Sequence, residues 1–165
     1  TPLLIQKQTP AEMKPTRLIP NPAAGRGRGK RLQDQIRSRF SYLRASDIAV
    51  TQFAGDERRI AEDALRAGCT TLVVVGGDGT CAGVADAVLK SGKQAAIAVI
   101  PSGTGNDCAK TLGVHDRSVD RIAALMEVWQ THQLDVGRAD GKQCSTRWGL
   151  GLEEEGWQAT QRGSI

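Results

Sequence analysis

Residues 72–80 have the sequence Leu-Val-Val-Val-Gly-Gly-Asp-Gly-Thr, in which four apolar residues lead directly into a glycine-rich turn. The apolar residues do not alternate with polar ones, which is typical of a central parallel strand that is buried on both faces. A second apolar run, residues 97–100, follows after a stretch of helical length. A strand, a glycine turn, a helix and a strand in this order predict a βαβ unit, and therefore an α/β fold.

Around this unit, short apolar runs alternate with amphipathic stretches from Thr16 to about Val136. This alternation predicts a mostly parallel sheet with crossover helices. The expected strands are residues 16–20, 47–53, 70–75, 96–100 and 132–137, and the expected helices are residues 28–41, 56–67, 80–90, 105–112 and 116–129. We expect an α/β domain over residues 16–138, an N-terminal extension over 1–15, and an atypical tail over 139–165 with no sustained period.

The chain has 165 residues, of which 39% are hydrophobic and 24% are charged, which is enough to build one ordinary core. This composition excludes a disordered chain, a collagen-like fibre and a coiled coil. The longest apolar runs are too short to span a bilayer, and residues 1–16 lack the pattern of a signal peptide. We therefore expect a cytoplasmic protein in which the four scattered cysteines are reduced and form no zinc site. These are Cys69, Cys81, Cys108 and Cys144.

The formal net charge is +4, which favours polyanionic partners such as phosphates, nucleic acid or an acidic membrane surface. Six basic residues cluster around the first glycine-rich stretch and the helix expected after it. They are Arg26, Arg28, Lys30, Arg31, Arg37 and Arg39. Such residues either contact phosphates or an anionic membrane surface, or form a solvated helix face. No nucleic-acid-binding motif accompanies them, so we expect no nucleic-acid partner.

Three glycine-rich stretches, residues 21–29, 76–80 and 102–107, each follow an expected strand and precede an expected helix. In a parallel sheet all strand-to-helix loops leave from the carboxyl edge, so we expect the three to meet at one crevice. Glycine lets the backbone approach a ligand, and the start of the next helix offers free N–H groups and a positive dipole end. The alternative for any one loop is a tight turn without a ligand. Three such loops on one edge predict a phosphate or nucleotide site.

Two common nucleotide motifs fit this chain poorly. Residues 24–31 approach a Walker A loop, but Ala24 stands at its first position and Arg31 replaces the hydroxyl residue that binds magnesium. Residues 77–82 match the G-x-G-x-x-[GA] pattern of a dinucleotide site. However, Ile-Pro-Ser at residues 100–102 ends the next strand without the acidic residue that would hold a ribose. The sequence excludes a P-loop ATPase and gives little support to a dinucleotide-binding Rossmann site.

Polar residues within the glycine-rich stretches have two alternative roles each. Asp78 would be repelled by phosphates unless a cation or a donor intervened, so it either orients a magnesium-bound phosphate or fixes its own loop through an Asx-type turn. Thr80 binds a phosphate oxygen, N-caps the next helix, or does both. Asn106 and Asp107 leave the same choice between ligand contact and capping open.

The three stretches together resemble the catalytic domain of the diacylglycerol kinase and sphingosine kinase superfamily. Asn-Pro-Ala-Ala-Gly (21–25), Val-Gly-Gly-Asp-Gly-Thr (75–80) and Ile-Pro-Ser-Gly-Thr-Gly-Asn-Asp (100–107) have the order and spacing of that superfamily. The resemblance extends over roughly residues 16–138. Gly-Gly-Asp-Gly-Thr alone is shared with NAD kinases, whereas residues 101–107 point to the lipid kinases. The resemblance implies a three-layer, Rossmann-like α/β fold of the NAD kinase and diacylglycerol kinase type.

The resemblance also implies ATP-dependent phosphorylation of a lipid hydroxyl of the diacylglycerol or sphingoid-base type, with ATP and Mg²⁺ as cofactors. Phosphoryl transfer depends largely on positioning and charge neutralisation, which such loops and a magnesium ion provide. Asp78 is the implied catalytic residue, in a cytoplasmic protein that could lie at the membrane periphery. The residues implied to line the nucleotide are Asn21, Pro22, Ala23, Ala24, Gly25, Thr51, Gly76, Gly77, Asp78, Gly79, Thr80, Cys81, Ala82, Gly103, Thr104 and Asn106. The alternatives are a nucleotide-binding remnant without catalysis and an NAD kinase.

The chain departs from the superfamily pattern at two places. Gly-Gly-Asp-Gly-Thr is usually followed by an Asn-Glu pair, whereas Ala82 and Gly83 stand here, so a polar side chain and a carboxylate are missing near the start of the helix. The superfamily continues into a β-rich second domain, to which only residues 149–153, Gly-Leu-Gly-Leu-Glu, bear a partial likeness. We expect this domain to be cut short or absent after about Gln143, through truncation or a change of reading frame.

Overall fold

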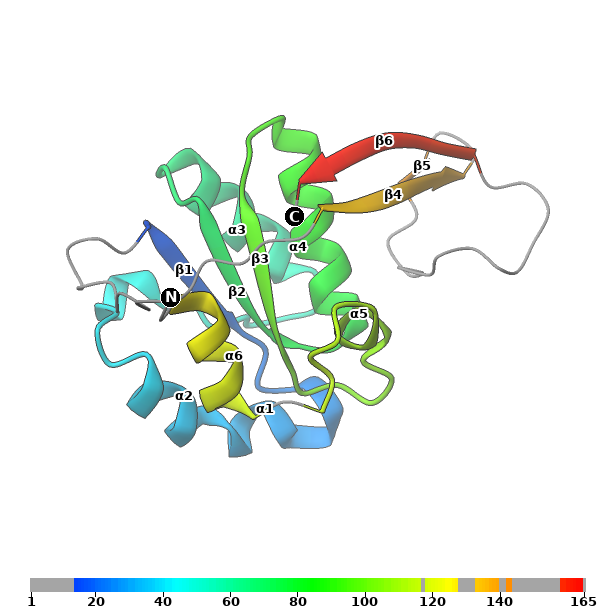
Figure 1. The fold of residues 1–165 in the computed structure, drawn as a ribbon. Helices are drawn as coiled ribbons and strands as arrows, with labels where there is room; N and C mark the ends of the chain where they lie inside the picture. The colour runs from blue at the N-terminus through cyan, green and yellow to red at the C-terminus, as the bar shows by residue number, and fades with distance from the viewer. Residues whose placement is uncertain (1–13, 117, 128–132, 140–141, 144–157, 165) are drawn as a thin grey trace, which may run out of the picture.

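Three parallel strands form the central sheet of the protein in a computed structural model that describes residues 14–116, 118–127, 133–139, 142–143 and 158–164 (Figure 1). The strands are β1 (Thr16–Pro20), β2 (Thr71–Gly76) and β3 (Ala96–Pro101), with β2 in the middle. Every residue of β2 is buried, as its unbroken apolar sequence predicts for a central strand. The predicted mostly parallel α/β sheet is therefore confirmed.

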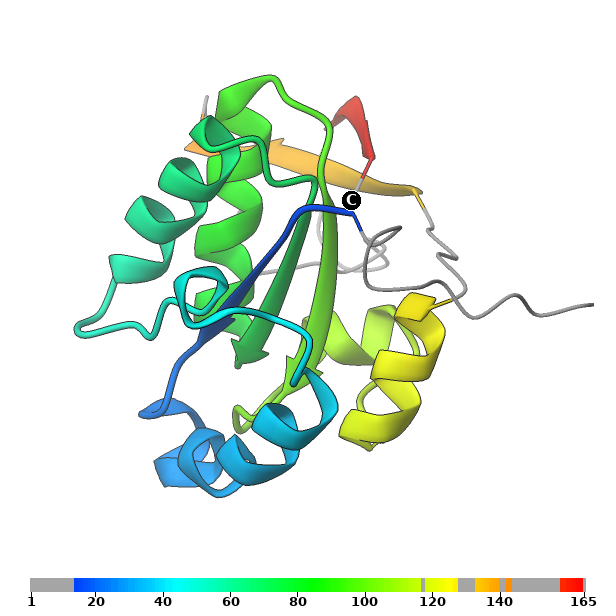
Figure 2. The same ribbon diagram turned by 90° about the vertical axis from the view of Figure 1, so that its left-hand side faces the viewer.

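Helices cover both faces of this sheet, which gives three layers (Figure 2). Successive strand residues point to opposite faces. Ile19, Leu72 and Val74 pack toward α3 (Asp56–Arg66), α4 (Asp78–Ser91) and α5 (Asp107–Thr111). Leu18, Val73 and Val75 pack toward α2 (Gln33–Arg39) and α6 (Val119–Glu127). The core is thus split into two apolar clusters, one on each face.

The strand predicted at residues 47–53 is present only as an edge segment. It forms one isolated parallel bridge, between Leu18 and Ile48, after the 3₁₀ turn η3 (Ala45–Asp47). Ala49 N donates to Leu18 O over 2.9 Å, and Thr51 N donates to Pro20 O over 3.0 Å. Pro20 has no N–H to return, so the ladder stops where a second bridge would form. The segment still lies beside β1, on the side away from β2.

The helix predicted at residues 28–41 is broken. Its place is taken by the 3₁₀ turn η2 (Ala24–Gly27), the single-turn α1 (Arg28–Arg31) and α2. Gly25, Arg26 and Gly27 have positive φ angles of 60°, 58° and 91°, so the first loop coils tightly before a helix can start. The other predicted helices are present with shifted ends, and α4 begins two residues earlier than predicted, at Asp78.

The fifth predicted strand forms, but it does not extend the parallel sheet. β4 (Gln133–Ala139) pairs antiparallel with β5 (Lys142–Gln143) and β6 (Gln158–Ser164), with a register shift between Val136 and Gly137. The sequence assigned no element to the β6 segment. Residues 149–153, Cys144 and all three tryptophans lie outside the described residues. Within the described part of the chain, no helix combines the length and apolar character needed to cross a membrane.

Candidate functional site

The carboxyl edge between β1 and β2 is the point where the chain changes direction. After β1 the chain passes through α2, which covers one face of the sheet, to the edge segment beside β1. It then returns to β2 through α3, which covers the other face. Such a switch point leaves a crevice at the carboxyl ends of the strands. Asn21 lies at this edge, where its backbone N–H donates to Val75 O over 2.8 Å and its Nδ2 donates to Thr80 Oγ1 over 2.9 Å. The first two glycine-rich loops therefore meet there.

The third loop joins the second at the same edge. Ser102 N donates to Gly76 O over 3.0 Å. A Cβ on Gly77 would lie 3.0 Å from Gly103 Cα, and a Cβ on Gly103 would collide with Gly77 Cα. Glycine is therefore needed at both positions, because the two backbones touch directly. The first loop reaches the third through Arg28, whose Nη1 donates to Gly103 O over 3.2 Å. All three loops come together, as the sequence predicted.

Asn106 shapes the third loop. Its Oδ1 accepts a hydrogen bond from Gly103 N over 3.0 Å, and its Nδ2 donates to Gly103 O over 2.9 Å. The residue itself has a positive φ of 55° and is the N-cap residue of α5. Both ends of its amide are thus used within the loop, while Thr104 and Gly105 stay exposed at the tip. The side chain of Asn106 acts on the loop backbone and makes no cap hydrogen bond to α5, so capping by this side chain, one of its two expected roles, is not observed.

Asp78 is the first residue of α4 and connects the second loop to the third. Its Oδ1 accepts from Cys108 N over 2.9 Å, at the start of α5. Its Oδ2 faces the third loop, where a Cβ on Gly105 would lie 2.9 Å away. One carboxylate oxygen therefore fixes the loop, and the side chain is only half-buried.

The start of α4 presents backbone donors to the loops. Gly77 is its N-cap residue, with no side-chain cap, so the first N–H groups of this helix lack an acceptor one turn earlier. Gly79 is exposed there. Thr80 is the third helical residue and is buried, with its hydroxyl against Asn21. Thr80 does not N-cap this helix, which was one of its expected roles, because the helix begins two residues before it.

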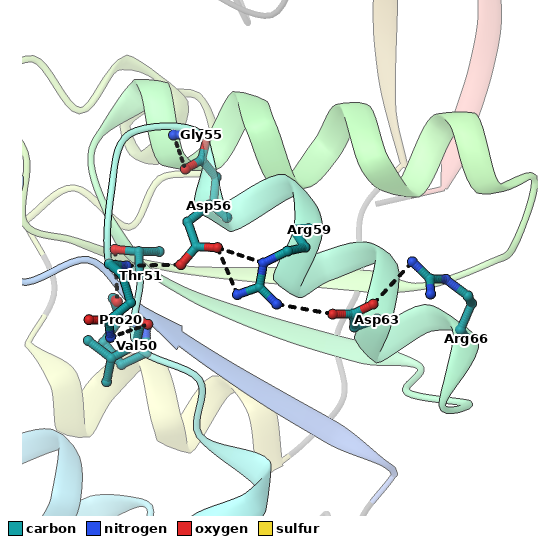
Figure 3. Close-up of polar contacts among 10 residues, drawn as sticks. Pro20, Val50, Thr51, Gly55, Asp56, Arg59, Asp63 and Arg66 are labelled. Atoms are coloured by element: carbon teal, nitrogen blue, oxygen red, sulfur yellow. Dashed lines mark hydrogen bonds and ion pairs between the residues drawn. The ribbon is translucent and has the colours of Figure 1, made fainter.

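Thr51 lies beside the first loop, held by the edge segment (Figure 3). Its N–H and its Oγ1 both donate to Pro20 O, over 3.0 and 3.4 Å, one residue before Asn21. Asp56 anchors this segment: its Oδ2 accepts from Gln52 N over 2.9 Å, and its Oδ1 pairs with Arg59 Nη2 over 2.8 Å. The Gln52 N–H and then the Arg59 guanidinium hold the pKa of Asp56 below its ordinary value. Thr51 is thus placed by a buried carboxylate on α3.

A carboxylate lies over Gly83 even though the chain has none at positions 82 and 83. Glu57, in the first turn of α3, is buried, and its Oε2 accepts from Gly55 N over 3.1 Å. A Cβ on Gly83 would collide with Glu57 Oε1 and lie 2.7 Å from its Cγ. The space that a side chain at position 83 would occupy is filled by Glu57. Sequence reasoning missed this residue, because only the packing of α3 on α4 brings positions 57 and 83 together.

Not every residue expected at the site faces the loops. Cys81 and Ala82 are buried, with 1% and 4% of their surface exposed, and Cys81 belongs to the apolar cluster that α4 forms with the sheet. Conversely, Ser102 was not expected at the site, yet it lies at the base of the third loop. Its Oγ is buried, and it has no hydrogen-bond partner among the described residues. Its position directly after a buried strand is the sequence signal that could have singled it out.

Comparison with known proteins identifies the family to which the chain belongs. A family model for the diacylglycerol kinase catalytic domain matches residues 15–139. The chain belongs to the diacylglycerol kinase catalytic domain family. This confirms the resemblance that the three loops carry, and the matched range contains β1 to β4 and all three loops.

Curated relatives within this family are named as lipid kinases. The chain is 43% identical over 96 residues to “Probable lipid kinase YegS-like” from Pseudomonas aeruginosa, which covers 58% of this chain and 31% of that protein. A protein of the same name from Pseudomonas putida is 38% identical over 112 residues, covering 66% of this chain and 37% of that protein. The chain therefore spans about a third of the length of the curated relatives it matches.

A solved structure supports the fold assignment. The crystal structure of a diacylglycerol kinase from Bacillus anthracis is similar with a TM-score of 0.64 and 28% sequence identity. The match covers 79% of this chain and 47% of that chain. The diacylglycerol kinase family fold thus accounts for the layers and for the edge at which the loops meet.

Proposed function

We propose that the protein is the nucleotide-binding part of an ATP-dependent lipid kinase, in which the three loops bind ATP and the γ-phosphoryl group passes to a lipid hydroxyl. The observation that carries this proposal is the meeting of three glycine-rich loops at one sheet edge, in a chain of the diacylglycerol kinase catalytic domain family. The names of the curated relatives support a lipid as the acceptor.

The side-chain contacts within the loops support phosphate binding by backbone N–H groups. The side chains of Asn21 and Asn106 hold the loops. Asn21 Oδ1 accepts from Ala23 N over 3.1 Å, and the Asn106 amide makes two hydrogen bonds to the Gly103 backbone. Phosphate contacts then fall to backbone N–H groups, above all those at the start of α4, where the helix dipole favours negative charge. The exposed Thr104 contributes a hydroxyl at the tip of the third loop.

Asp78 is the carboxylate that we propose as the protein ligand of a magnesium–ATP complex. Mg²⁺ is usually held by one or two carboxylates together with the phosphates of the substrate. Among the described residues, no group of three or more His, Cys, Asp or Glu is placed to hold a metal, so the phosphates would supply most of the ligands. Asp78 Oδ2, which faces the third loop, would be the protein ligand. The ion would neutralise phosphate charge during transfer.

The test is a pair of measurements on the purified chain. Labelled ATP, Mg²⁺ and diacylglycerol in detergent micelles are incubated with the protein, and transfer of the label to lipid is followed while ATP binding is measured by calorimetry. We expect magnesium-dependent ATP binding and a labelled lipid. A sphingoid base and NAD replace diacylglycerol in parallel reactions. Label on NAD alone would contradict the lipid assignment and favour the NAD kinase alternative.

The two measurements separate binding from catalysis. Binding of ATP without transfer to any lipid would leave nucleotide binding in place and reject catalysis by this chain. Absence of ATP binding would reject the proposed site itself. Gly103→Val provides a matched negative control for binding, because a side chain at this position collides with Gly77.

A peripheral location at an anionic membrane surface is part of the same proposal. Four basic residues of the first loop and α1 are exposed, namely Arg26, Arg28, Lys30 and Arg31. Each basic residue near an anionic surface contributes about 1 kcal/mol to membrane binding. We expect the protein to sediment with vesicles of anionic phospholipid and to remain in solution with vesicles of phosphatidylcholine. Equal sedimentation with both would contradict the electrostatic attraction.

A further inference from the structure

Two cysteines from neighbouring helix starts lie in contact beneath the loops. Cys81 is in the first turn and a half of α4, and Cys108 is the second residue of α5. Their Sγ atoms are 2.8 Å apart, and the residues are 1% and 3% exposed. Neither side chain reaches the open face of the loops, so the nucleotide site as proposed makes no use of either thiol.

The backbone around this pair is fixed from both sides. Cys108 N donates to Asp78 Oδ1, which places the start of α5 against the start of α4. Cys81 N donates to Gly77 O over 3.0 Å. A disulfide requires an S–S bond of about 2.05 Å, so each sulfur atom has to move by less than 1 Å to close one. The separation of the two sulfur atoms is therefore within a small movement of the bonded distance.

We propose that Cys81 and Cys108 form a modification site for small peroxides, at which oxidation joins the second and third loops through a reversible disulfide. One thiol, as its thiolate, attacks an oxygen of hydrogen peroxide; the O–O bond breaks, and the leaving hydroxide takes a proton to become water. The resulting sulfenic acid is attacked by the other sulfur atom, the S–S bond forms, and the hydroxyl leaves as a second water molecule. Overall, two thiols and one peroxide give one disulfide and two waters.

The environment of the pair accounts for a resting state with both thiols reduced. The hydrogen bond with Cys108, followed by burial, raises the pKa of the Cys81 thiol, which lowers its thiolate fraction and slows its reaction with peroxide. Peroxide is close to water in size, whereas larger oxidants are excluded from a buried pair. The third cysteine among the described residues, Cys69, follows α3 and is only half-buried, which makes it the natural comparison within the chain.

The test uses the full chain and hydrogen peroxide. After treatment at neutral pH, catalase removes the peroxide, and the protein is denatured and alkylated with N-ethylmaleimide. A tryptic digest without reductant is then analysed by mass spectrometry. Lys90 and Lys93 lie between the two cysteines, so cleavage separates them unless they are linked. We expect a Cys81–Cys108 peptide pair that dithiothreitol releases, together with the loss of two alkylated thiols from the four in the chain.

Matched variants show whether the pair reacts as a unit. Cys108→Ser and Cys81→Ser are each expected to abolish the cross-linked peptide, whereas Cys69→Ser leaves it unchanged. The proposal is overturned if both thiols of the wild-type chain remain alkylated after N-acetylcysteine in the same solution has been fully oxidised. It is also overturned if Cys81 links to Cys69 or Cys144 in place of Cys108. Cys69 and Cys81 lie in the same tryptic peptide, residues 67–90, so fragmentation of the linked peptides in the mass spectrometer assigns the bonded cysteine. The wild-type chain alone gives this answer, even if a serine variant fails to fold.

The consequence for the loops is measured separately. A disulfide that closes the chain between residues 81 and 108 is expected to raise the melting temperature by roughly 5–10 °C. Backbone hydrogen exchange over residues 102–108 should slow at the same time. A lower melting temperature in the oxidised protein would show that the loops must distort, which contradicts the proposed geometry. None of these readouts depends on ATP, so their failure is distinct from failure of the proposed kinase function.

Discussion

Two helices of this protein begin with the same pair of residues and use them differently. α3 has Gly55 as its N-cap residue and starts at Asp56, whereas α4 has Gly77 as its N-cap residue and starts at Asp78. Neither N-cap makes a side-chain hydrogen bond, so an acidic residue in the first turn favours each helix start. The two starts share this Gly-Asp pair, and they differ in the residues that follow it and in what the carboxylate contacts.

Asp56 closes its own loop, and Asp78 joins two loops. Asp56 is fully buried, with one oxygen on Gln52 N and the other on Arg59. Asp78 is half-buried, with one oxygen on Cys108 N and the other facing the third loop. The first carboxylate is neutralised by a protein cation within its own helix, while the second lies among the loops that we propose bind a magnesium–ATP complex. Asp56 thus has a stabilising role on α3, whereas the role that we propose for Asp78 on α4 is in ligand binding.

The largest expected effect comes from removing the charge of Asp78. In Asp78→Asn the amide oxygen still accepts from Cys108 N, so the loops and the melting temperature should change little. Transfer of phosphate to lipid should fall at least a hundredfold, which corresponds to about 3 kcal/mol in the transition state. Rates are measured in the micelle assay. Asp107→Asn, which alters an exposed carboxylate one residue before Cys108, is the control and should retain its activity. A rate for Asp78→Asn within threefold of wild type would remove Asp78 from the site.

The fold and the meeting of the loops were predictable because both follow from local patterns. The unbroken apolar run of residues 72–75 predicts a central parallel strand, and parallel strands bring their carboxyl ends to one edge. The break at Pro20 was also readable in principle, since proline cannot complete a ladder. The contact between Glu57 and Gly83 was not predictable, because it depends on how closely α3 approaches α4. The antiparallel sheet of β4 was missed because a short apolar run does not encode its partner.

The second largest effect tests whether Glu57 fills the place of a side chain at position 83. Gly83→Glu inserts a carboxylate where Glu57 already lies, so overpacking and like charge should destabilise the fold by about 2–3 kcal/mol. Glu57→Ala in the same chain vacates the space. The double variant should therefore recover at least 1 kcal/mol relative to additivity, a coupling expected only for residues in contact. Urea unfolding of the four proteins completes the cycle.

The outcome of this cycle bears directly on the two helix starts. A coupling energy near zero would mean that α3 and α4 shift apart to accept both carboxylates, and Glu57 would then not define the space over α4. Gly92→Ala, at the αL cap of α4, provides a control for general damage to the helix, because a Cβ added at this position would meet nothing within 4 Å. The loss of stability in Gly92→Ala arises from backbone conformation alone, so the size of this loss should be the same with and without Glu57→Ala.

A smaller effect is expected from the pH dependence of Asp56. Its pKa is lowered in the folded protein, so its stabilising contribution is present above the ordinary carboxyl pKa of about 3.9 and is lost as the pH falls through the lower folded value. Asp56→Asn should lower the melting temperature by several degrees at pH 7. The difference from wild type should shrink below about pH 4, as the wild-type carboxylate becomes protonated. A difference in melting temperature that stays constant down to pH 2.5 would exclude a stabilising charge at Asp56. The control is Asp63→Asn, which alters an exposed partner of Arg59.

The smallest effect concerns the second attachment of the third loop. Asp78 holds that loop from α4, and Arg28 reaches it from α1 through a 3.2 Å hydrogen bond to Gly103 O. Because Arg28 is exposed, its removal in Arg28→Ala should cost less than about 1 kcal/mol of stability. Affinity for ATP should fall two- to fivefold by calorimetry, since the loop loses one of its restraints. Arg31→Ala, in the same helix and equally exposed, removes the same charge without this contact. An equal loss of ATP affinity in both variants would assign that loss to positive charge near the phosphates. A loss confined to Arg28→Ala would assign it to the position of the third loop. In that case Arg28 and Asp78 would both be needed to hold the loop.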